Sequence, residues 1–303
     1  MLDFHQDIIS EKFCGDGVPV WLIDEIKGYK TFPFPLGKKI PMNSSGTPDW
    51  DKCDQKNWGK YYFSYDVGEV FNHLYNPGSH LHKKFVQYWQ KIAETFRGNP
   101  YVIAYELINE PFVGNAIRNP LLLIPSMAER FKFQQFYDSV VTAIRKKDPD
   151  TNICFEPITF DFAFNSGFTH VPGGNMYKNK SILCYHFESP PLKPSSKSLK
   201  YMNARLRDMK RLGIPILMSE FGGDPTIREF VEDHLQSYFY WQYKNFGKNW
   251  GSQGNLTFTT PKEEGGLGLV NPDGSIDEKE VPNVARTILQ RTAGHLINMA
   301  YKV

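Results

Sequence analysis

The stretch YVIAYELINEPFVGN, residues 101–115, joins an apolar run to a group of polar side chains. Residues 101–108 are expected to form a buried strand, which Pro111 ends shortly afterwards. Glu106, Asn109 and Glu110 stand within or just after this strand, where taking charge out of water is costly. A charge is tolerated at such a place when a cleft uses it, so this strand end is the first candidate for a functional site. Glu106 lies deeper in the strand, and we interpret it as a structural polar contact.

Further apolar runs alternate with amphipathic segments along the chain. The end of a strand is expected in MLDFHQD, and whole strands are expected in NICFEP, SILCYHF, IPILMSEF and YFYWQY. Helical spacing of apolar residues predicts helices over 82–97, 127–147, 196–212 and 225–237, and a closing helix with a linker within 281–296. Residues 8–80 are expected to be rich in loops, and a loop region this long is usually functional.

The alternation of strands and helices predicts an α/β fold. Strands that are apolar on both faces are typical of a parallel sheet covered by helices, either doubly wound or closed into a barrel. Five strand ends carry polar or aromatic groups: His5 with Asp7, Asn109 with Glu110, His186, Glu220 and Trp241. This favours a (β/α)8 TIM barrel, whose active site is built from strand ends. A dinucleotide-binding fold is disfavoured, because no helix pattern follows the GGLG at residues 265–268.

Composition excludes some classes of protein and leaves others open. The 303 residues are 41% hydrophobic and 22% charged, which is typical of a globular protein. A formal net charge of +2 provides no electrostatic footprint for nucleic acid. The 15% of aromatic residues suits a groove that stacks on sugar rings, or equally a large aromatic core. The first residues lack the pattern of a signal peptide, and no apolar run reaches the length of a membrane span.

The four cysteines point to no zinc site, because none forms a C-x-x-C pair. Cys154 and Cys184 lie in apolar runs and are expected to be buried free thiols. Cys14 and Cys53 lie in loop-like sequence and could pair if the protein is secreted. Weak support for a secretory route comes from three N-x-S/T sequons, at Asn43, Asn179 and Asn255.

Two glutamates at strand ends, Glu110 and Glu220, suit the hydrolysis of a glycosidic bond. One carboxyl group protonates the leaving oxygen while the other attacks the anomeric carbon, at a separation of about 5–5.5 Å in retaining enzymes. Asn109 is placed to donate to the sugar 2-hydroxyl, a contact that strengthens in the transition state. The structural alternative is that Glu110 caps the following turn or pairs with an arginine.

Segments in a fixed order carry a resemblance to a known family. ELINEP with the downstream SEFG resembles glycoside hydrolase family 5, which consists of retaining enzymes on a (β/α)8 barrel. Its endoglycoceramidase branch is the closer match, through HQD (5–7), FCGDGVPVW (13–21), FRGNPYVIAYELINEPFVGN (96–115), VPGG (171–174), YHFESPP (185–191) and WQYKNFG (241–247). The similarity extends over nearly the whole chain.

The resemblance implies roles for individual residues. Glu110 would be the general acid/base and Glu220 the nucleophile, and no cofactor or metal is implied. The ligands of the cleaved sugar would be His5, Asp7, Asn109, Tyr185, His186 and Trp241. In the family a tyrosine near this strand end approaches the nucleophile, but the usual YHYY-like run reads YHFE here. On the sequence alone, a single histidine such as His5 is more often a structural group, although the nearby Asp7 and the motif favour a functional one, and Trp241 is equally a core aromatic.

The resemblance also predicts a domain organisation. Residues 1–285 would form a partial barrel catalytic domain with about six of the eight β/α units, since the family's first two strands have no counterpart here. Residues 286–303 would be a linker toward a C-terminal β-sandwich that the chain lacks. We therefore expect a fragment that is truncated at its N-terminus, with impaired stability and uncertain activity. The full-length form is expected to be secreted or lysosomal and digestive, and to be a monomer.

The expected function is a retaining β-glycosidase that cleaves the bond between glycan and ceramide in glycosphingolipids. Contact with a membrane surface would help it reach this lipid, and Phe32, Phe34, Leu36 and Ile40 could line a groove for acyl chains or simply pack on the barrel. One alternative is a family 5 endoglucanase or mannanase that acts on polysaccharide. The other is a non-catalytic remnant that binds glycolipid.

Overall fold

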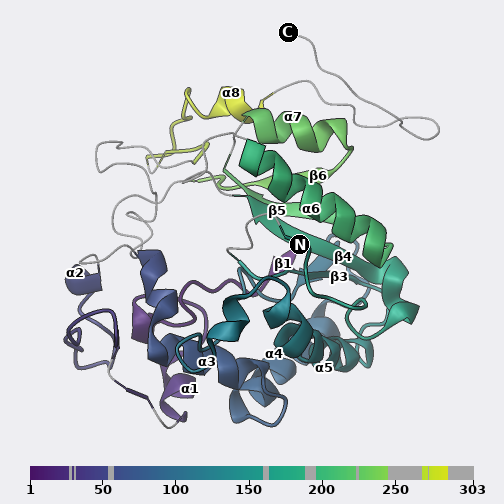
Figure 1. Ribbon diagram of the computed structural model, residues 1–303. Coiled ribbons are helices and arrows are strands. Elements are labelled where there is room, and N and C mark those ends of the chain that lie inside the picture. The colour runs from purple at the N-terminus through teal and green to yellow at the C-terminus, as the bar shows by residue number, and fades with distance from the viewer. Residues whose placement is uncertain are drawn as a thin grey trace.

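The chain folds around one parallel sheet (Figure 1). A computed structural model describes residues 1–26, 29–30, 32–53, 58–159, 164–187, 196–222, 225–244, 268–271 and 273–285. Six strands pair in the order β1-β2-β3-β4-β5-β6, and every pairing is parallel. The strands are β1 Leu2–Asp3, β2 Ala104–Glu106, β3 Asn152–Phe155, β4 Ser181–Phe187, β5 Ile216–Phe221 and β6 Ser237–Tyr240.

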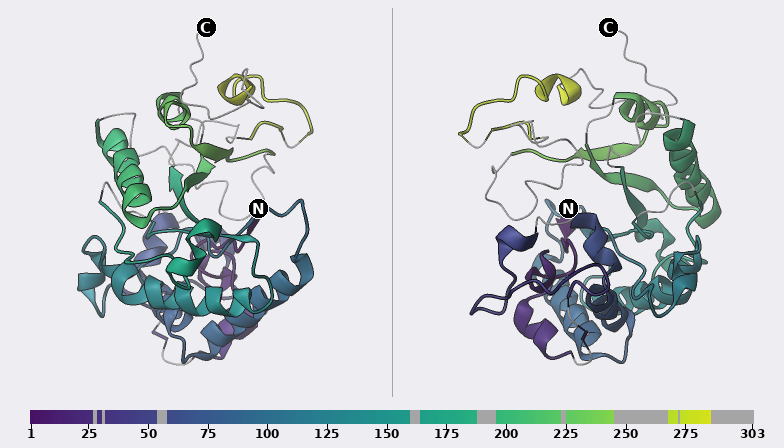
Figure 2. Two further views of the ribbon diagram at one scale, coloured as in Figure 1. Left: turned by 90° about the vertical axis from the view of Figure 1, so that its right-hand side faces the viewer. Right: turned by 60° about the vertical axis from the view of Figure 1, so that its left-hand side comes forward.

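The sheet curls into part of a barrel, with the helices on its outer side (Figure 2). The α-helices are α1 Val20–Asp24, α2 Trp50–Cys53, α3 Tyr65–Tyr75, α4 His80–Phe96, α5 Gln134–Arg145, α6 Ser196–Leu212, α7 Pro225–Asp233 and α8 Val281–Val284. Four 3-10 turns are η1 Glu11–Phe13, η2 Trp58–Phe63, η3 Pro120–Leu123 and η5 Asn175–Lys180, and a π-helical turn, η4 Glu129–Phe133, leads into α5. This arrangement confirms the prediction of an incomplete (β/α)8 barrel.

The two faces of the strands contact different layers. Small or sulfur-containing side chains of β2 to β4 meet inside the curl, where Ala104, Cys154 and Cys184 form a buried cluster. The alternate residues of the same strands, among them Tyr105 and Tyr185, join the large core between sheet and helices. Both faces are therefore apolar, which is why the strands read as continuous hydrophobic runs.

Most predicted elements are present, with shifted ends. The strand expected over 101–108 shortens to β2: before it, Tyr101 and Ile103 are 90% and 54% exposed, and after it Leu107 and Ile108 are buried outside the strand. The segment 8–80 is less loop-rich than expected, because it contains α3 and the start of α4. Residues 286–303, the expected linker, lie outside the described residues, so this boundary remains a prediction.

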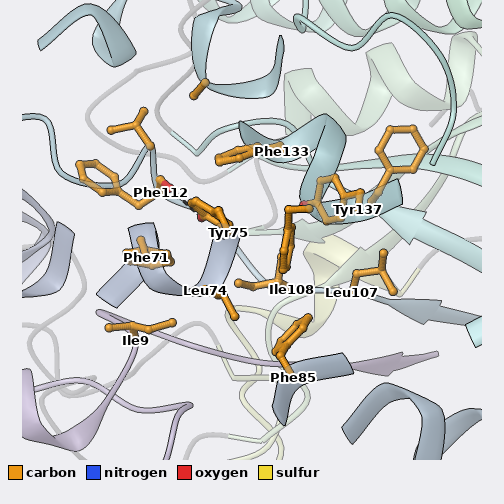
Figure 3. Close-up of a cluster of buried hydrophobic side chains, with 14 of the residues drawn as sticks. Ile9, Phe71, Leu74, Tyr75, Phe85, Leu107, Ile108, Phe112, Phe133 and Tyr137 are labelled. Atoms are coloured by element: carbon orange, nitrogen blue, oxygen red, sulfur yellow. Dashed lines mark hydrogen bonds between the residues drawn. The ribbon is translucent and has the colours of Figure 1, made fainter. Parts of the chain in front are cut away.

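Aromatic side chains fill the core between α3, α4, α5 and the segment after β2 (Figure 3). The Tyr75 ring lies 4.8 Å from that of Phe133, and its hydroxyl donates to the carbonyl oxygen of Phe112 at 2.7 Å. Phe85 packs on Phe136 with ring centroids 5.4 Å apart. The large aromatic core that composition left open is therefore present.

Helix α3 lies against the backbone that follows β2. A Cβ atom added at Gly68 would be 2.6 Å from the Cα atom of Asn115, so only glycine permits this approach. The Asn115 side chain donates to Glu69 of the same helix at 2.8 Å. The long N-terminal segment thus supports the strand end that carries Glu110.

A disulfide between Cys14 and Cys53 ties the segment after β1 to α2. The pairing of Cys14 with Cys53, which the sequence left open, is therefore present. Cys154 and Cys184 are buried free thiols, as expected. In the part of the chain that the structure describes, no helix has both the length and the apolar composition of a membrane span.

We expect the double substitution Cys14→Ser/Cys53→Ser to lower the free energy of unfolding by about 2–4 kcal/mol, because the bond closes a loop with a sequence separation of 39 residues. Urea denaturation of the two proteins measures this difference. Dithiothreitol should lower the midpoint of the parent protein and leave that of the double variant unchanged. An equal effect of the reductant on both would contradict the prediction.

Candidate active site

Four acidic or basic side chains meet at the carboxyl ends of the central strands. His186 belongs to β4 and Glu220 to β5, whereas Glu110 and Glu156 follow β2 and β3. This is the edge at which β/α barrels place their active sites. All four side chains are buried or nearly so, since the most exposed of them, Glu110, has 16% of its side chain accessible.

A shift in strand register turns Glu220 toward His186. Along β4 and β5, Cys184 pairs with Leu217 and Tyr185 with Met218, but His186 pairs with Glu220. Ser219 is the additional residue. With regular alternation Ser219 would stand beside His186 and Glu220 would face the helices. The bulge therefore places the Glu220 carboxylate on the inner face of the curled sheet, beside His186.

Glu110 has an unusual backbone conformation that two side chains hold. Its φ angle of 41° lies in the left-handed region, which non-glycine residues rarely occupy. The Glu110 N–H donates to Oε1 of Glu156 at 3.3 Å, and the Glu110 carbonyl oxygen accepts from Nε2 of Gln6 at 3.0 Å. Such conformations persist where the surroundings over-determine them, and they cluster at active sites.

The imidazole of His186 lies beside both predicted catalytic carboxylates. Its Nδ1 atom is 3.2 Å from Oε1 of Glu110 and 3.8 Å from Oε2 of Glu220. These two oxygens can therefore be separated by at most about 7 Å, whereas the carboxyl groups of glycosidase pairs lie about 5–9.5 Å apart. The structure thus brings the two glutamates together, although they lie far apart along the chain.

The acidic groups decide the charge of His186. Burial alone lowers the pKa of its imidazole, but the carboxylates of Glu156, Glu220 and Glu110 outweigh burial and raise that pKa well above 6.5. Burial raises the pKa of Glu156 well above 4.5 and that of Glu106 to about 7, and the charge of His186 opposes both shifts. The site therefore holds a cationic imidazole beside two carboxyl groups, those of Glu156 and Glu106, whose pKa values are raised.

Glu106, Glu156 and His186 also form a possible metal-binding group, since one donor atom from each lies within 4.8 Å of the others. An imidazolium explains the same arrangement without a metal, because Nδ1 faces Glu110 and Nε2 is 3.4 Å from Glu156. That the reaction needs no metal or cofactor stays a prediction.

His5 and Asp7, in the segment after β1, lie in the same region as Asn109, which follows β2. Partial burial lowers the pKa of His5, but hydrogen bonds and charges of Asp3 and Asp7 reverse this and raise it. Burial raises the pKa of Asp7 to about 7, and the charge of Glu110 adds to that shift. The Asn109 amide donates to the carbonyl oxygen of Gln6 at 3.1 Å, so in this structure it holds the loop.

Tyr185 does not join the carboxylate pair. It points to the opposite face of β4 from His186, and its hydroxyl donates to Oε1 of Gln236 at 2.6 Å. Its ring packs 6.2 Å from that of Tyr201 on α6. Its side chain lies on the opposite face from His186 because strand alternation sends neighbouring side chains to opposite faces, and its contact with substrate stays a prediction.

Trp241 directly follows β6 at the same end of the sheet. Its N–H donates to the carbonyl oxygen of Phe221 at 3.0 Å, which places its backbone beside the end of β5, one residue after Glu220. Its side chain is half-buried, and its role as a ligand of the cleaved sugar stays a prediction.

Two residues that bind the backbone of Glu110 were not predicted from the sequence, Gln6 and Glu156. Gln6 donates to the carbonyl oxygens of both Asn109 and Glu110, at 2.8 and 3.0 Å. Glu156 had a visible signal, because CFEP repeats the pattern of INEP, with an apolar strand that ends in glutamate and proline. Gln6 had none apart from its place between His5 and Asp7.

We expect Glu106→Gln to change how stability depends on pH. The unfolded chain releases this proton near pH 4.5 and the folded chain near 7. The stability that the bound proton confers is fully present below pH 4.5. Between pH 4.5 and 7 the free energy of unfolding of the parent protein should fall relative to that of Glu106→Gln, by at most about 1.4 kcal/mol per pH unit. Urea denaturation at several pH values measures the difference. The exposed Glu94→Gln serves as control, and parallel curves for parent and Glu106→Gln would contradict the prediction.

Comparison with known proteins agrees with the geometry. Residues 54–247, more than half of the chain, match the model of the cellulase family, glycosyl hydrolase family 5. An endoglycoceramidase of Hydra vulgaris is 37% identical over 100% of this chain and 57% of its own length, and one of Cyanea nozakii is 35% identical over 99% and 59%. The chain thus spans less than three fifths of these curated relatives.

Solved structures share the fold. Endo-glycoceramidase II from Rhodococcus sp., in complex with a five-membered iminocyclitol, superposes with a TM-score of 0.64 at 22% identity, over 94% of this chain and 60% of that one. A ganglioside GM3 complex of the same protein superposes with a TM-score of 0.60 over 91% of this chain and 60% of that one, also at 22% identity. With its partial barrel, its paired glutamates and this similarity, the chain belongs to glycosyl hydrolase family 5.

Proposed function

We propose that the chain is a retaining β-glycosidase that hydrolyses the bond between glycan and ceramide in glycosphingolipids. The observation that carries this proposal is the approach of Glu110 and Glu220 to the same nitrogen of His186. Retaining glycosidases need two carboxyl groups on opposite sides of one glycosidic bond. The upper limit of about 7 Å between these two oxygens is compatible with the separation of about 5–5.5 Å that retaining enzymes use.

Each side chain then has a defined part in two steps. The carboxylate of Glu220 attacks the anomeric carbon while the bond to the leaving oxygen breaks and Glu110 donates a proton to that oxygen. Water next attacks the glycosyl-enzyme, gives its proton to Glu110 and releases Glu220. The imidazolium of His186 lies between the two and can stabilise whichever carboxylate is negative in each state.

The lipid part of the proposed substrate is supported by the relatives named endoglycoceramidase and by exposed apolar side chains in the segment that follows Glu110. The segment that leads away from Glu110 leaves several large apolar side chains about half exposed: Ile117, Leu121, Leu123, Ile124 and Phe131. Exposed apolar side chains of this kind suit contact with a membrane surface, where the proposed substrate resides. In the N-terminal segment, Phe32 and Ile40 are core residues, and Phe34 is 46% exposed.

The disulfide supports a proposed location outside the cytosol. Such bonds persist in oxidising compartments, so Cys14–Cys53 is consistent with a secreted protein or a lysosomal, digestive one. That the protein acts as a monomer is likewise part of the proposal.

A second candidate is a glycosidase that acts on polysaccharide, because the family model that matches the chain is described as cellulase. The same two carboxyl groups would perform the same steps on a sugar leaving group. The two candidates differ in whether an apolar surface is needed for the part of the substrate that leaves.

We expect the chain to release glycan from a fluorescent glycosphingolipid and to leave carboxymethyl-cellulose intact. Glu220→Gln should reduce kcat at least about a thousandfold, because the nucleophile is lost, and Glu110→Gln by about 10²–10⁴-fold, because the proton donor is lost. Chromatography of the released glycan measures both. Glu94→Gln, an exposed carboxylate on α4, is the control. Cellulose hydrolysis would favour the second candidate, and glycolipid binding without turnover would indicate a non-catalytic binding protein.

We also expect the released glycan to appear first as the β-anomer, because two successive inversions at one carbon restore the configuration. Proton NMR of the anomeric hydrogen, recorded before mutarotation, measures this. Initial release of the α-anomer would contradict the retaining mechanism while leaving the glycosidase activity intact.

A further inference from the structure

Glu156 lies at the centre of the site but has no step in the reaction proposed above. It follows β3 directly and is only 3% exposed. A buried carboxylate is costly unless its surroundings use it. Its contacts therefore indicate what it does.

The same oxygen of Glu156, Oε1, contacts both Glu110 and His186. Oε1 accepts the N–H of Glu110 at 3.3 Å and lies 3.4 Å from Nε2 of His186. The other nitrogen of that imidazole is 3.2 Å from Oε1 of Glu110. The contacts form a closed ring that runs from Glu156 to the Glu110 backbone, through the Glu110 side chain to His186, and back to Glu156. The backbone and the carboxyl group of Glu110 are therefore both held in place with respect to Oε1 of Glu156.

The backbone of Glu156 is itself anchored from the helix layer. The hydroxyl of Tyr137, a core residue of α5 (Figure 3), donates to the carbonyl oxygen of Glu156 at 3.0 Å. Farther along, the N–H of Thr159 donates to the carbonyl oxygen of Pro111 at 3.1 Å, which joins the segment after Glu156 to the turn after Glu110. The oxygen is thus supported by rigid elements, as precise positioning requires.

The charge of Glu156 and the place of its oxygen are separate properties. Groups on several strands act on this charge: His186 on β4, Glu106 on β2, Asp3 on β1, and Glu110. The contacts that Glu110 and His186 make with Oε1 both require an acceptor at that point. A neutral acceptor at the same place would preserve the ring, whereas a displaced carboxylate would open it.

We propose that Glu156 is a positioning residue, whose Oε1 atom orients the Glu110 carboxyl group for proton donation by holding the Glu110 backbone and the His186 imidazole together. The inference rests on the proposed glycosidase function. It assigns to Glu156 no contact with the substrate. Its effect reaches the reaction only through Glu110.

This role has a chemical signature that general loss of structure lacks. Cleavage of a glycolipid needs a proton on the leaving oxygen, whereas dinitrophenolate leaves as a stable anion without one. A misplaced acid therefore slows the first reaction and spares the formation of the glycosyl-enzyme in the second. A fault in folding slows both equally.

The experiment compares two matched variants of the full chain. Glu156→Gln keeps an oxygen at the position of Oε1 and removes the charge, whereas Glu156→Asp keeps the charge and withdraws the oxygen by one methylene group. For each variant, kcat/KM is measured on a glycosphingolipid and on the dinitrophenyl β-glycoside of the same glycan. Glu129→Gln is the control, because Glu129 is a buried carboxylate that accepts the N–H of Ile158 in the same segment.

We expect Glu156→Asp to lose at least about tenfold more kcat/KM on the glycolipid than on the activated glycoside. Glu156→Gln should retain most of the parent ratio between the two substrates, and Glu129→Gln all of it. An unchanged ratio in Glu156→Asp, or an equal change in the Asp and Gln variants, would overturn the proposal. If the parent protein cleaves neither substrate, the proposed function fails instead.

A structural measurement tests the inference without turnover. In a crystal structure of Glu156→Asp, the Glu110 carboxyl group should have turned beyond hydrogen-bond distance of His186, whereas in Glu156→Gln it should remain within that distance. A Glu110 side chain that keeps its place in the Asp variant would refute the positioning role whether or not the chain is active.

Discussion

The contact of one buried imidazole with three carboxyl groups is the constraint on which the site depends. His186 can remain cationic inside the protein because Glu156, Glu220 and Glu110 surround it, and these carboxyl groups can be buried because the imidazolium lies among them. The four side chains come from four successive strand ends. The parallel order of the sheet is therefore a requirement of the electrostatics as well as of the packing.

Backbone irregularities turn this sheet edge into a site. Regular alternation would leave Glu220 among the helices, and the additional residue Ser219 corrects its direction. Glu110 occupies the left-handed region and is held there by side chains from two other segments. In both places the local geometry departs from the ideal where the carboxylates must converge, and the remaining strands are regular enough to keep them fixed.

The sequence predicted the elements whose pattern is local. SILCYHF matches β4, and residues 196–212 match α6, because apolar periodicity specifies such segments without reference to the rest of the chain. It also predicted that Glu110 and Glu220 meet. It could not predict that Tyr185 faces away or that Gln6 and Glu156 hold Glu110, because these facts depend on strand register and on pairings between distant segments. Helix α3 was not predicted, because the prolines and glycines around it are typical of loops. Four of its apolar residues nevertheless have helical spacing: Val67, Val70, Phe71 and Leu74.

The backbone angle at residue 110 bears on how this protein can change over evolutionary time. Glycine adopts that conformation freely, so replacing the glutamate would relieve both an unfavourable backbone state and a charge withdrawn from water. Stability alone would thus favour losing the side chain. Under the proposed function, the need for its chemistry retains the glutamate, and a copy of the gene without that need could evolve into a more stable protein that lacks the glycosidase activity.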